Sequence, residues 1–597
     1  MSGSGSGGEG RTVNGGIVLM GLQILTMYYW VILLMNSDSH FSVHLIVGAG
    51  GAVTCYINRK EGRKLRDRWE KVLTLLFTFL FSTAVVAANY HMFGNLNVPG
   101  IARILAVIAA FLGGWSIFGN ILIYLTARLR DFSFRERAEG GKLRPWVLFL
   151  LLMLPMTVIN ILALFLCEYP GNLTADSGWQ VRQLMTGTYS NHNPVYHTLM
   201  IKVFVKVGLG IFGDINVGVA LYCVAQILFM ASCFAYGMLT LYQKGIPTKY
   251  ILCCVLFYTL MPYHIVYSAT VWKDVVFSGA VLLFVVSTFR ILHGMGNGIA
   301  NYLVFVLGSV GVCLLRSNGW FVYLMTSAIF SLLFWKRWKK LCLLCLCLLG
   351  VTFVLKHPVL TALNVIQPDP IESLSIPAQQ IARVVSDCND LTAEQRALLE
   401  NVVEVDRIPQ AYAPVLSDPI KYLVRETDNQ SYLSEHGGEF IRLYFELGIS
   451  HPVKYVQAWI DQTKGYWNGG YDNWRWSREA AGSEFGIRRT VHSEKVNQWL
   501  DNYLWMYENT NGLAVFLCIG FHVWIVIVMC YLCLVRRDRV SFFTTLPVLT
   551  LILSLLMATP VYSEFRYAYA VFCVLPFLIF APFGNYQFRK IKNIREK

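Results

Sequence analysis

Two aspartates lie where an otherwise apolar chain becomes polar, and both could take part in acid–base or metal chemistry. Asp176 lies in segment 167–198, the longest polar interruption in the first half of the chain. Asp274 follows Trp272 and Lys273 at the start of an apolar run. In the transfer of a group to a hydroxyl or amine, a carboxylate can take or orient the acceptor proton, or hold a metal that neutralises a phosphate leaving group. The alternative for each aspartate is a helix cap.

Three cations lie near the same predicted depth as the aspartates. Lys273, Arg316 and Arg566 fall at ends of apolar runs that the basic clusters elsewhere predict to be external. Because membrane proteins place cations preferentially on the internal side, these three indicate an anion bound at the outer interface, with arginine suited to phosphate. The alternative is snorkelling, or simple pairing with Glu564 or Asp274.

Histidines and aromatic residues supply the remaining candidates. His192 and His197 could join Asp176 around a divalent metal, but no compact ligand spacing is present, and such histidines are more often hydrogen-bonding loop residues. Aromatic residues crowd into 466–476 and 499–507. They could form stacking platforms, although interfacial belts and core packing need the same residues. The candidates for acceptor or loop roles are His192, His197, Tyr567, Trp474 and Trp476.

Composition identifies a membrane protein. Of the 597 residues 55% are hydrophobic and 14% are charged, and the mean hydropathy is +0.49. Apolar runs recur near the length needed to cross about 30 Å of hydrocarbon. The net charge of +14 resides in short basic clusters between these runs. The clusters are therefore topology signals, and no nucleic-acid partner is expected.

The runs predict an all-α polytopic protein with about fourteen spans and both ends inside. Residues 1–16 read as a flexible tail, 17–127 as four N-terminal spans, 146–355 as a membrane core, 512–583 as the last three spans, and 584–597 as a basic cytoplasmic tail. Segment 195–212 carries Lys202 and Lys206 on one helical face and is predicted to lie in the interface. The core spans are predicted at 146–166, 215–242, 250–268, 274–293, 301–315, 320–335 and 341–355.

Segment 358–511 differs in kind from the rest of the chain. It holds 21 acidic against 13 basic residues and no run long enough to span. We expect an external domain, α-rich or α/β. Thr392, followed three residues later by Gln395, predicts a capping box that opens a helix.

These residues resemble the GT-C superfamily of membrane glycosyltransferases, which includes protein O-mannosyltransferases and the aminoarabinose transferase of lipid A. The resemblance rests on Asp176 in the first external loop of the core, His192 and Pro194 in NHNPVYHTLM, Asp274 in WKDVVFSGAVLLF, and a late Arg566-Tyr567. It covers roughly 146–583. The motifs YPGNLTADS, LLRSNG and IPAQQIARV are similar to an uncharacterised bacterial family of that superfamily.

The resemblance implies inverting transfer of a sugar from a polyprenyl-phosphate donor to an envelope acceptor at the external face of a bacterial cell membrane. Asp176 would be the base or the acceptor-orienting group, with Asp274 as the second acid. Many relatives carry paired acids in this loop, whereas here Ser177 follows Asp176 and Glu168 lies eight residues earlier; metal use therefore stays open. A transporter or flippase of an envelope lipid and a non-catalytic assembly partner are the competing hypotheses.

Overall fold

The computed structural model describes residues 9–35, 41–134, 143–388, 390–470 and 473–584. Within these ranges the chain forms helices, loops and isolated β-bridges but no strand, which confirms the all-α prediction. Segment 358–511, predicted to be α-rich or α/β, is therefore α-rich in its described residues. Eleven of the described helices are long and apolar enough to cross a membrane, or thirteen if each of two bent pairs is one span. The chain is therefore a polytopic helical membrane protein.

One long helix accounts for two of the predicted spans. α14 (Gly319–Val354) includes 320–335 and 341–355, and its backbone leaves helical geometry at Trp338, where φ is −126° and ψ is 40°. The Trp320 indole donates a hydrogen bond of 3.2 Å to the Leu349 carbonyl. A straight helix would hold these residues on the order of 40 Å apart. The two halves therefore fold back on each other as two arms, as predicted.

Two predicted spans are broken. Segment 250–268 divides into α10 (Thr248–Leu260) and α11 (Pro262–Ser268), bent by 54°. The break falls at Pro262, which has no amide hydrogen to continue the helical ladder. The run 512–535 likewise opens with a short helical piece, Asn511–Leu517, bent by 63° from α25 (Ile519–Val535). The prediction of continuous spans was wrong at both places.

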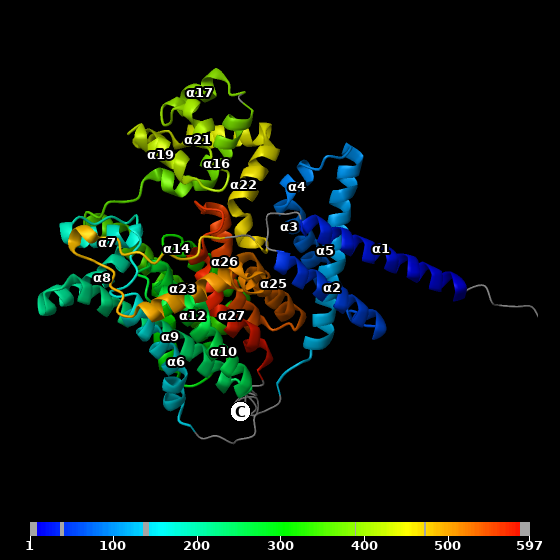
Figure 1. The fold of residues 1–597 in the computed structure, drawn as a ribbon, viewed down its shortest axis with the longest axis horizontal. Coiled ribbons are helices and arrows are strands. Elements are labelled where there is room, and N and C mark those ends of the chain that lie inside the picture. Colours follow the sequence, from blue (N-terminus) through cyan, green and yellow to red (C-terminus); the bar gives the residue numbers. More distant parts are fainter. Residues whose placement is uncertain (1–8, 36–40, 135–142, 389, 471–472, 585–597) are drawn as a thin grey trace, which may run out of the picture. The chain divides into compact units, whose positions relative to one another are not determined.

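Two further predictions concern segments 1–16 and 195–212. α1 (Glu9–Met35) begins inside the predicted flexible tail, so that prediction was wrong for 9–16; residues 1–8 and nearly all of the predicted basic tail lie outside the described residues. α8 (Val195–Val207), continued by a π-helical turn to Phe212, has the length and apolarity of a span. In Figure 1 it runs crosswise to α6 (Pro145–Cys167). The prediction that it lies in the interface stays a prediction.

The chain divides into two compact units, the first of which comprises Met1–Phe132, Trp467–Asp472 and Thr510–Arg537. The four predicted N-terminal spans are α1, α2 (Phe41–Lys60), α3 (Arg68–Ala88) and α5 (Gly100–Leu129), and the other three pack against α5. α25 joins them late in the chain. The Tyr531 hydroxyl shares hydrogen bonds of 2.8 Å with Thr74 and 2.6 Å with Thr126, which ties α25 to α3 and α5.

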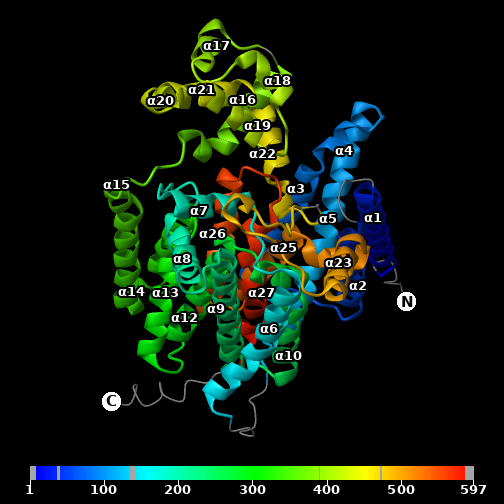
Figure 2. The ribbon, with the colours of Figure 1, turned by 60° about the vertical axis from the view of Figure 1, so that its left-hand side comes forward.

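The second unit is a helix bundle built around α12 (Lys273–Leu292). All of the apolar window of α12 is buried, against α9 (Ile215–Gln243), α13 (Gly298–Leu314), α26 (Arg539–Ala558) and α27 (Tyr569–Phe580) (Figure 2). Close packing with α13 depends on Gly308, where an added Cβ would lie 2.6 Å from the Phe284 backbone nitrogen. The central helix thus has a fixed depth, and its first two residues, Lys273 and Asp274, lie at one end of the bundle.

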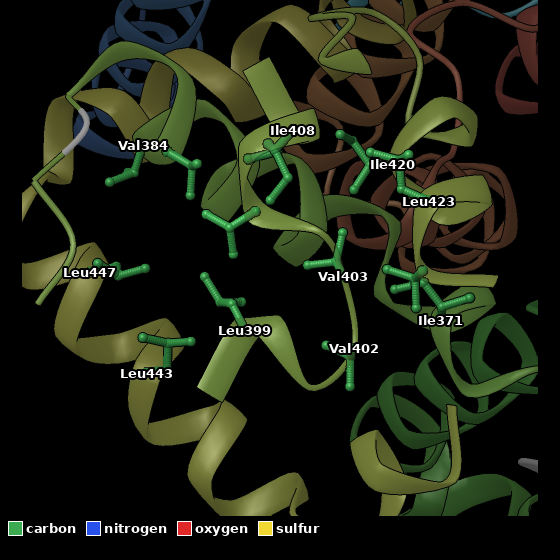
Figure 3. Close-up of a cluster of buried hydrophobic side chains, with 14 of the residues drawn as sticks. Ile371, Val384, Leu399, Val402, Val403, Ile408, Ile420, Leu423, Leu443 and Leu447 are labelled. Atoms are coloured by element: carbon green, nitrogen blue, oxygen red, sulfur yellow. The ribbon is translucent and has the colours of Figure 1, made fainter. Parts of the chain in front are cut away.

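A helical subdomain of the same unit has its own apolar core. It is formed by α16 (Ser375–Asp387), α17 (Ala393–Glu400), α19 (Asp418–Glu426), α21 (Gly437–Ser450) and α22 (Pro452–Trp467). Val384, Leu399, Val403, Leu443 and Leu447 are buried together at its centre (Figure 3). Thr392 and Gln395 form the predicted capping box at the start of α17. This packing explains why 358–511 has no spanning run yet holds many helices.

Candidate functional site

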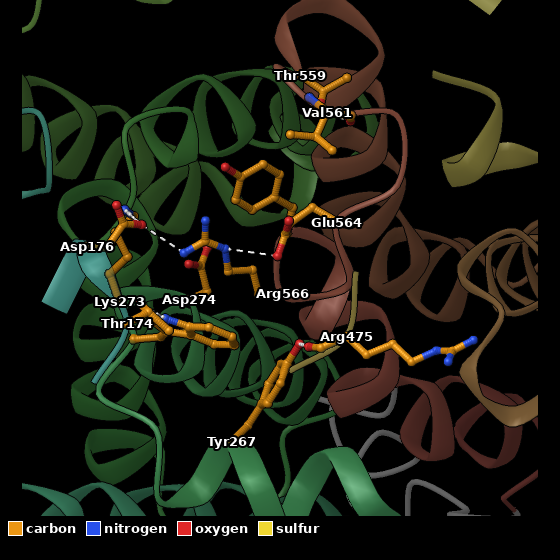
Figure 4. Close-up of polar contacts among 12 residues, drawn as sticks. Thr174, Asp176, Tyr267, Lys273, Asp274, Arg475, Thr559, Val561, Glu564 and Arg566 are labelled. Carbon is orange, nitrogen blue, oxygen red and sulfur yellow. Dashed lines mark hydrogen bonds and ion pairs between the residues drawn. The ribbon is translucent and has the colours of Figure 1, made fainter. Parts of the chain in front are cut away.

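Six charged side chains from separate segments meet at one end of the second unit's bundle; all of them but Arg316 are labelled in Figure 4. Asp176 comes from the first turn of α7 (Ala175–Thr186), and Lys273 and Asp274 come from the first turn of α12. The others are Arg316, between α13 and α14, and Glu564 and Arg566, between α26 and α27. The structure therefore brings together the two predicted acids and all three predicted cations.

Asp176 is held between two cations. Its Oδ2 lies 2.8 Å from Nη1 of Arg566 and 3.4 Å from Nζ of Lys273. Lys273 also donates to the amide oxygen of Asn193. The charge of Lys273 lowers the pKa of Asp176 most; burial opposes it, and Arg566 reinforces it, so the pKa lies well below its usual range. The Asp176 carboxylate is consequently a weak base that fixes the positions of two cations.

Loop 167–198 places Asp176 by docking against the start of α12. The Ser177 hydroxyl donates to the Val271 carbonyl, and the Trp272 indole donates to the Thr174 hydroxyl at 2.8 Å. Thr174 is the N-cap of α7, so Asp176 lies inside the first turn and its side chain faces the cations. The helix-cap alternative for Asp176 does not apply, whereas the favourable dipole of the α7 N-terminus does.

Asp274 and Arg316 form a second, deeper ion pair. Arg316 Nη1 lies 2.9 Å from Asp274 Oδ1 and donates at 3.0 Å to the carbonyl of Tyr567, whose ring lies 4.4 Å from the guanidinium carbon. Lys356 Nζ donates to the carbonyls of Arg316 and Ser317 at 3.3 and 2.6 Å. Sequence reasoning missed Lys356, although its position just beyond the predicted span 341–355 gave the same signal as Arg316.

Glu564 has the opposite electrostatic setting to Asp176. It is 7% exposed, and its Oε1 lies 3.1 Å from Nε of Arg566. Burial is the main influence and raises the pKa of Glu564 to about 7; Arg566 opposes the rise, and the nearby charges of Asp274 and Asp176 add to it. The sequence suggested Glu564 only as a partner for Arg566. Two carboxyl groups with pKa values pushed apart are typical of sites that handle protons.

One irregular segment, 473–490, ties the Asp176 loop to the Glu564 segment. The amide of Leu173 donates to Glu479, and the amide of Ala481 donates back to Leu173, each at 2.7 Å. Trp474 exchanges backbone hydrogen bonds with the Glu564 segment, donating to Ser563 at 3.0 Å and accepting from Phe565 at 2.9 Å. Both halves of the charged cluster are thus fixed to the same stretch of chain.

The aromatic candidates separate into buried and exposed residues. Tyr466 is fully buried, and its hydroxyl accepts the Glu564 amide at 3.0 Å and donates to the Val561 carbonyl at 3.1 Å. Trp474 is 56% exposed and Trp476 is half-buried. Tyr466 therefore supports the site from beneath, while the Trp474 ring is open to a ligand.

The two histidines behave differently from the acids and cations. His197 is buried, with Nδ1 3.1 Å from the Gln180 side-chain oxygen and Nε2 2.7 Å from the Tyr222 hydroxyl. Both ring nitrogens are used, so His197 is a structural residue of the loop. His192 lies near enough to lower the pKa of Asp176. Among the described residues, Asp176, His192 and His197 do not converge to the distances of a metal site.

The fold and the site define a polytopic membrane protein with a paired-charge cluster at one end of its helix bundle. The chain belongs to the family described as "Family of unknown function (DUF6020)", whose model matches residues 184–596. The match includes five of the six charged residues and begins eight residues after Asp176. No curated protein and no solved structure matches the chain.

Proposed function

We propose that this protein is a glycosyltransferase that moves a sugar from a polyprenyl-phosphate donor to an envelope acceptor at the external face of a bacterial cell membrane. The observation that carries the proposal is the convergence of Lys273, Arg316 and Arg566 at one end of the apolar bundle, beside carboxylates of contrasting pKa. The resemblance to the GT-C superfamily supports the same reaction class.

A polyprenyl-phosphate donor suits the position of these cations. Its chain would lie in the hydrocarbon, which places its phosphate at the ends of the membrane-spanning helices. The side chains of Lys273 and Arg566 are 16% and 17% exposed, and that of Arg316 is 9% exposed, so the first two are the more accessible partners. Ion pairs with Asp176 hold Lys273 and Arg566 in place before the donor arrives.

In the proposed reaction the acceptor oxygen or nitrogen forms a bond to the anomeric carbon while the bond from that carbon to the phosphate oxygen breaks. The electron pair of the broken bond leaves with the polyprenyl phosphate, whose charge the cations stabilise. The acceptor proton passes to a carboxylate. Glu564 fits this role better than Asp176 because its pKa lies near 7, whereas the pKa of Asp176 is depressed. Asp176 positions the cations and orients the acceptor.

The acceptor would approach from the side of Trp474. Its exposed ring lies on the segment whose backbone pairs with Ser563 and Phe565, on either side of Glu564. A sugar or lipid headgroup can stack on such a ring without a charge partner. The proposal therefore assigns the acceptor role to 473–476, which holds Trp474 and Trp476, two of the predicted acceptor candidates.

A radiolabelled polyprenyl-phosphate sugar, added to the purified protein with envelope membranes, tests the proposal. We expect label in the acceptor fraction and free polyprenyl phosphate as co-product, with both lost in Asp176→Asn. The control variant is Lys202→Ala. The amine of Lys202 donates to the Tyr189 hydroxyl and is not one of the six charged groups of the cluster. Donor binding without transfer, followed by movement of the lipid between leaflets of a vesicle, would replace the proposal with the transporter or flippase hypothesis.

A further inference from the structure

A second group of ligand-type side chains lies in the helical subdomain, and the proposed transfer reaction makes no use of it. Cys388 and Asp390 follow the end of α16, and His451 lies between α21 and α22. One ligand atom from each lies within 4.8 Å of the others, and the Asp390 Oδ2 is 3.3 Å from the His451 Nε2. Thiolate sulfur, imidazole nitrogen and carboxylate oxygen are the donor atoms that zinc takes in proteins.

The backbone positions two of the three ligands. The Cys388 amide donates to the Val384 carbonyl at 2.9 Å as the C-cap of α16. The His451 amide donates to the Leu447 carbonyl at 2.8 Å, and its own carbonyl accepts the Tyr455 amide at 3.2 Å. His451 therefore ends one helix and begins the next.

Helix dipoles at this spot favour a cation. α16 and α21 are 13 and 14 residues long, pack against each other, and end at the ligand group. Neither has a basic residue in its last turn. Each C-terminus carries roughly half a negative charge on its unpaired carbonyls. Lys454, the nearby amine, is 2.9 Å from Asp387, so its charge is already paired with a carboxylate outside the group.

We infer that Cys388, Asp390 and His451 form a zinc-binding site that joins the C-terminal ends of α16 and α21. In a tetrahedral zinc site the ligand atoms lie roughly 3.5 Å apart, so the group needs only a small inward movement to close. The partial exposure of Asp390 and His451 leaves the fourth position open to water. α16 also carries Arg383, whose Nη1 lies 2.7 Å from Asp461 of α22, so zinc would add a second link at the end of α16.

Metal retention by the full-length protein tests the inference independently of any transfer assay. Protein stripped of metal is incubated with Zn²⁺ or Co²⁺, desalted and assayed for bound ion, and Co²⁺ additionally reports thiolate ligation by its near-ultraviolet charge-transfer band. We expect about one ion per chain, with the thiolate band. Both should be lost in Cys388→Ser and His451→Asn.

Two controls and one conservative variant keep the test decisive. His436→Asn alters a histidine of the same subdomain that bonds the Tyr432 carbonyl, and Cys347→Ser alters an exposed thiol elsewhere; both should retain the ion. Asp390→Asn changes a half-exposed side chain, so it should fold normally and bind more weakly. No retained ion in the wild type, or equal retention in Cys388→Ser and His451→Asn, would overturn the inference.

Discussion

The replacement of Glu564 by glutamine gives the sharpest test of the site's electrostatics. Glutamine is nearly isosteric with the protonated carboxyl, so the variant imitates the form of Glu564 that burial favours. The ordinary pKa of a glutamate is 4.5, and in the folded protein that of Glu564 is about 7. Between these values the folded protein holds a proton that the unfolded chain has released. The stability contributed by that proton is complete below about pH 4.5 and is lost as the pH rises through about 7.

The size of the effect follows from the shift. A difference of about 2.5 units corresponds to roughly 3 kcal/mol, since each unit is worth about 1.4 kcal/mol. Glu564 is 7% exposed, so little of this is screened by solvent. We therefore expect Glu564→Gln to match the wild type near pH 4.5 and to exceed its stability by up to roughly 3 kcal/mol above about pH 8.

Thermal unfolding of both proteins in the same detergent, over a series of pH values, measures this difference. The control is Glu479→Gln, an exposed glutamate in the neighbouring segment, which should show no such trend. In the transfer assay Glu564→Gln should lose activity at every pH. Wild-type activity should rise with pH through about 7 as Glu564 loses its proton. A stability gain independent of pH would refute the burial argument, and full activity in Glu564→Gln would remove it as the proton acceptor.

Three further predictions concern the same site. Asp176→Asn should abolish transfer with normal expression and an unchanged helical circular dichroism spectrum, because Asp176 lies on a loop outside the bundle core; retained transfer would exclude it from the mechanism. Lys273→Ala should weaken the binding of polyprenyl phosphate by about 10- to 100-fold, the value of a charge-assisted hydrogen bond, whereas equal affinity in Lys273→Ala and Lys202→Ala would place the phosphate elsewhere. Trp474→Ala should raise the acceptor concentration needed for half-maximal transfer several-fold through the loss of stacking, with donor affinity unchanged; a parallel loss of donor affinity would indicate a packing role.

The sequence alone determined most of the membrane architecture and five of the six charged residues of the site, Glu564 being the exception. Spanning helices depend on the local length and apolarity of each run, so most spans, the doubled arms of α14 and the capping box at Thr392 could be predicted residue by residue. Membrane proteins place cations preferentially at internal helix ends. Arg316 and Arg566 were recognisable because they lie at helix ends predicted to be external. The failures were also local in origin: Pro262 breaks a run whose composition reads as continuous, and α1 begins before its apolar stretch does.

Only the tertiary structure decided how these residues are paired. Arg566 bonds Asp176 across 390 positions. Lys273 reaches the same carboxylate from α12, which packs closely against α13 at Gly308 and Phe284. The proposed transfer of the proton-accepting role from Asp176 to Glu564 also depends on tertiary structure. Neighbouring cations lower the pKa of Asp176, whereas burial raises that of Glu564. Desolvation and ion pairing are sums over atoms from distant segments, and no local pattern in the chain records them.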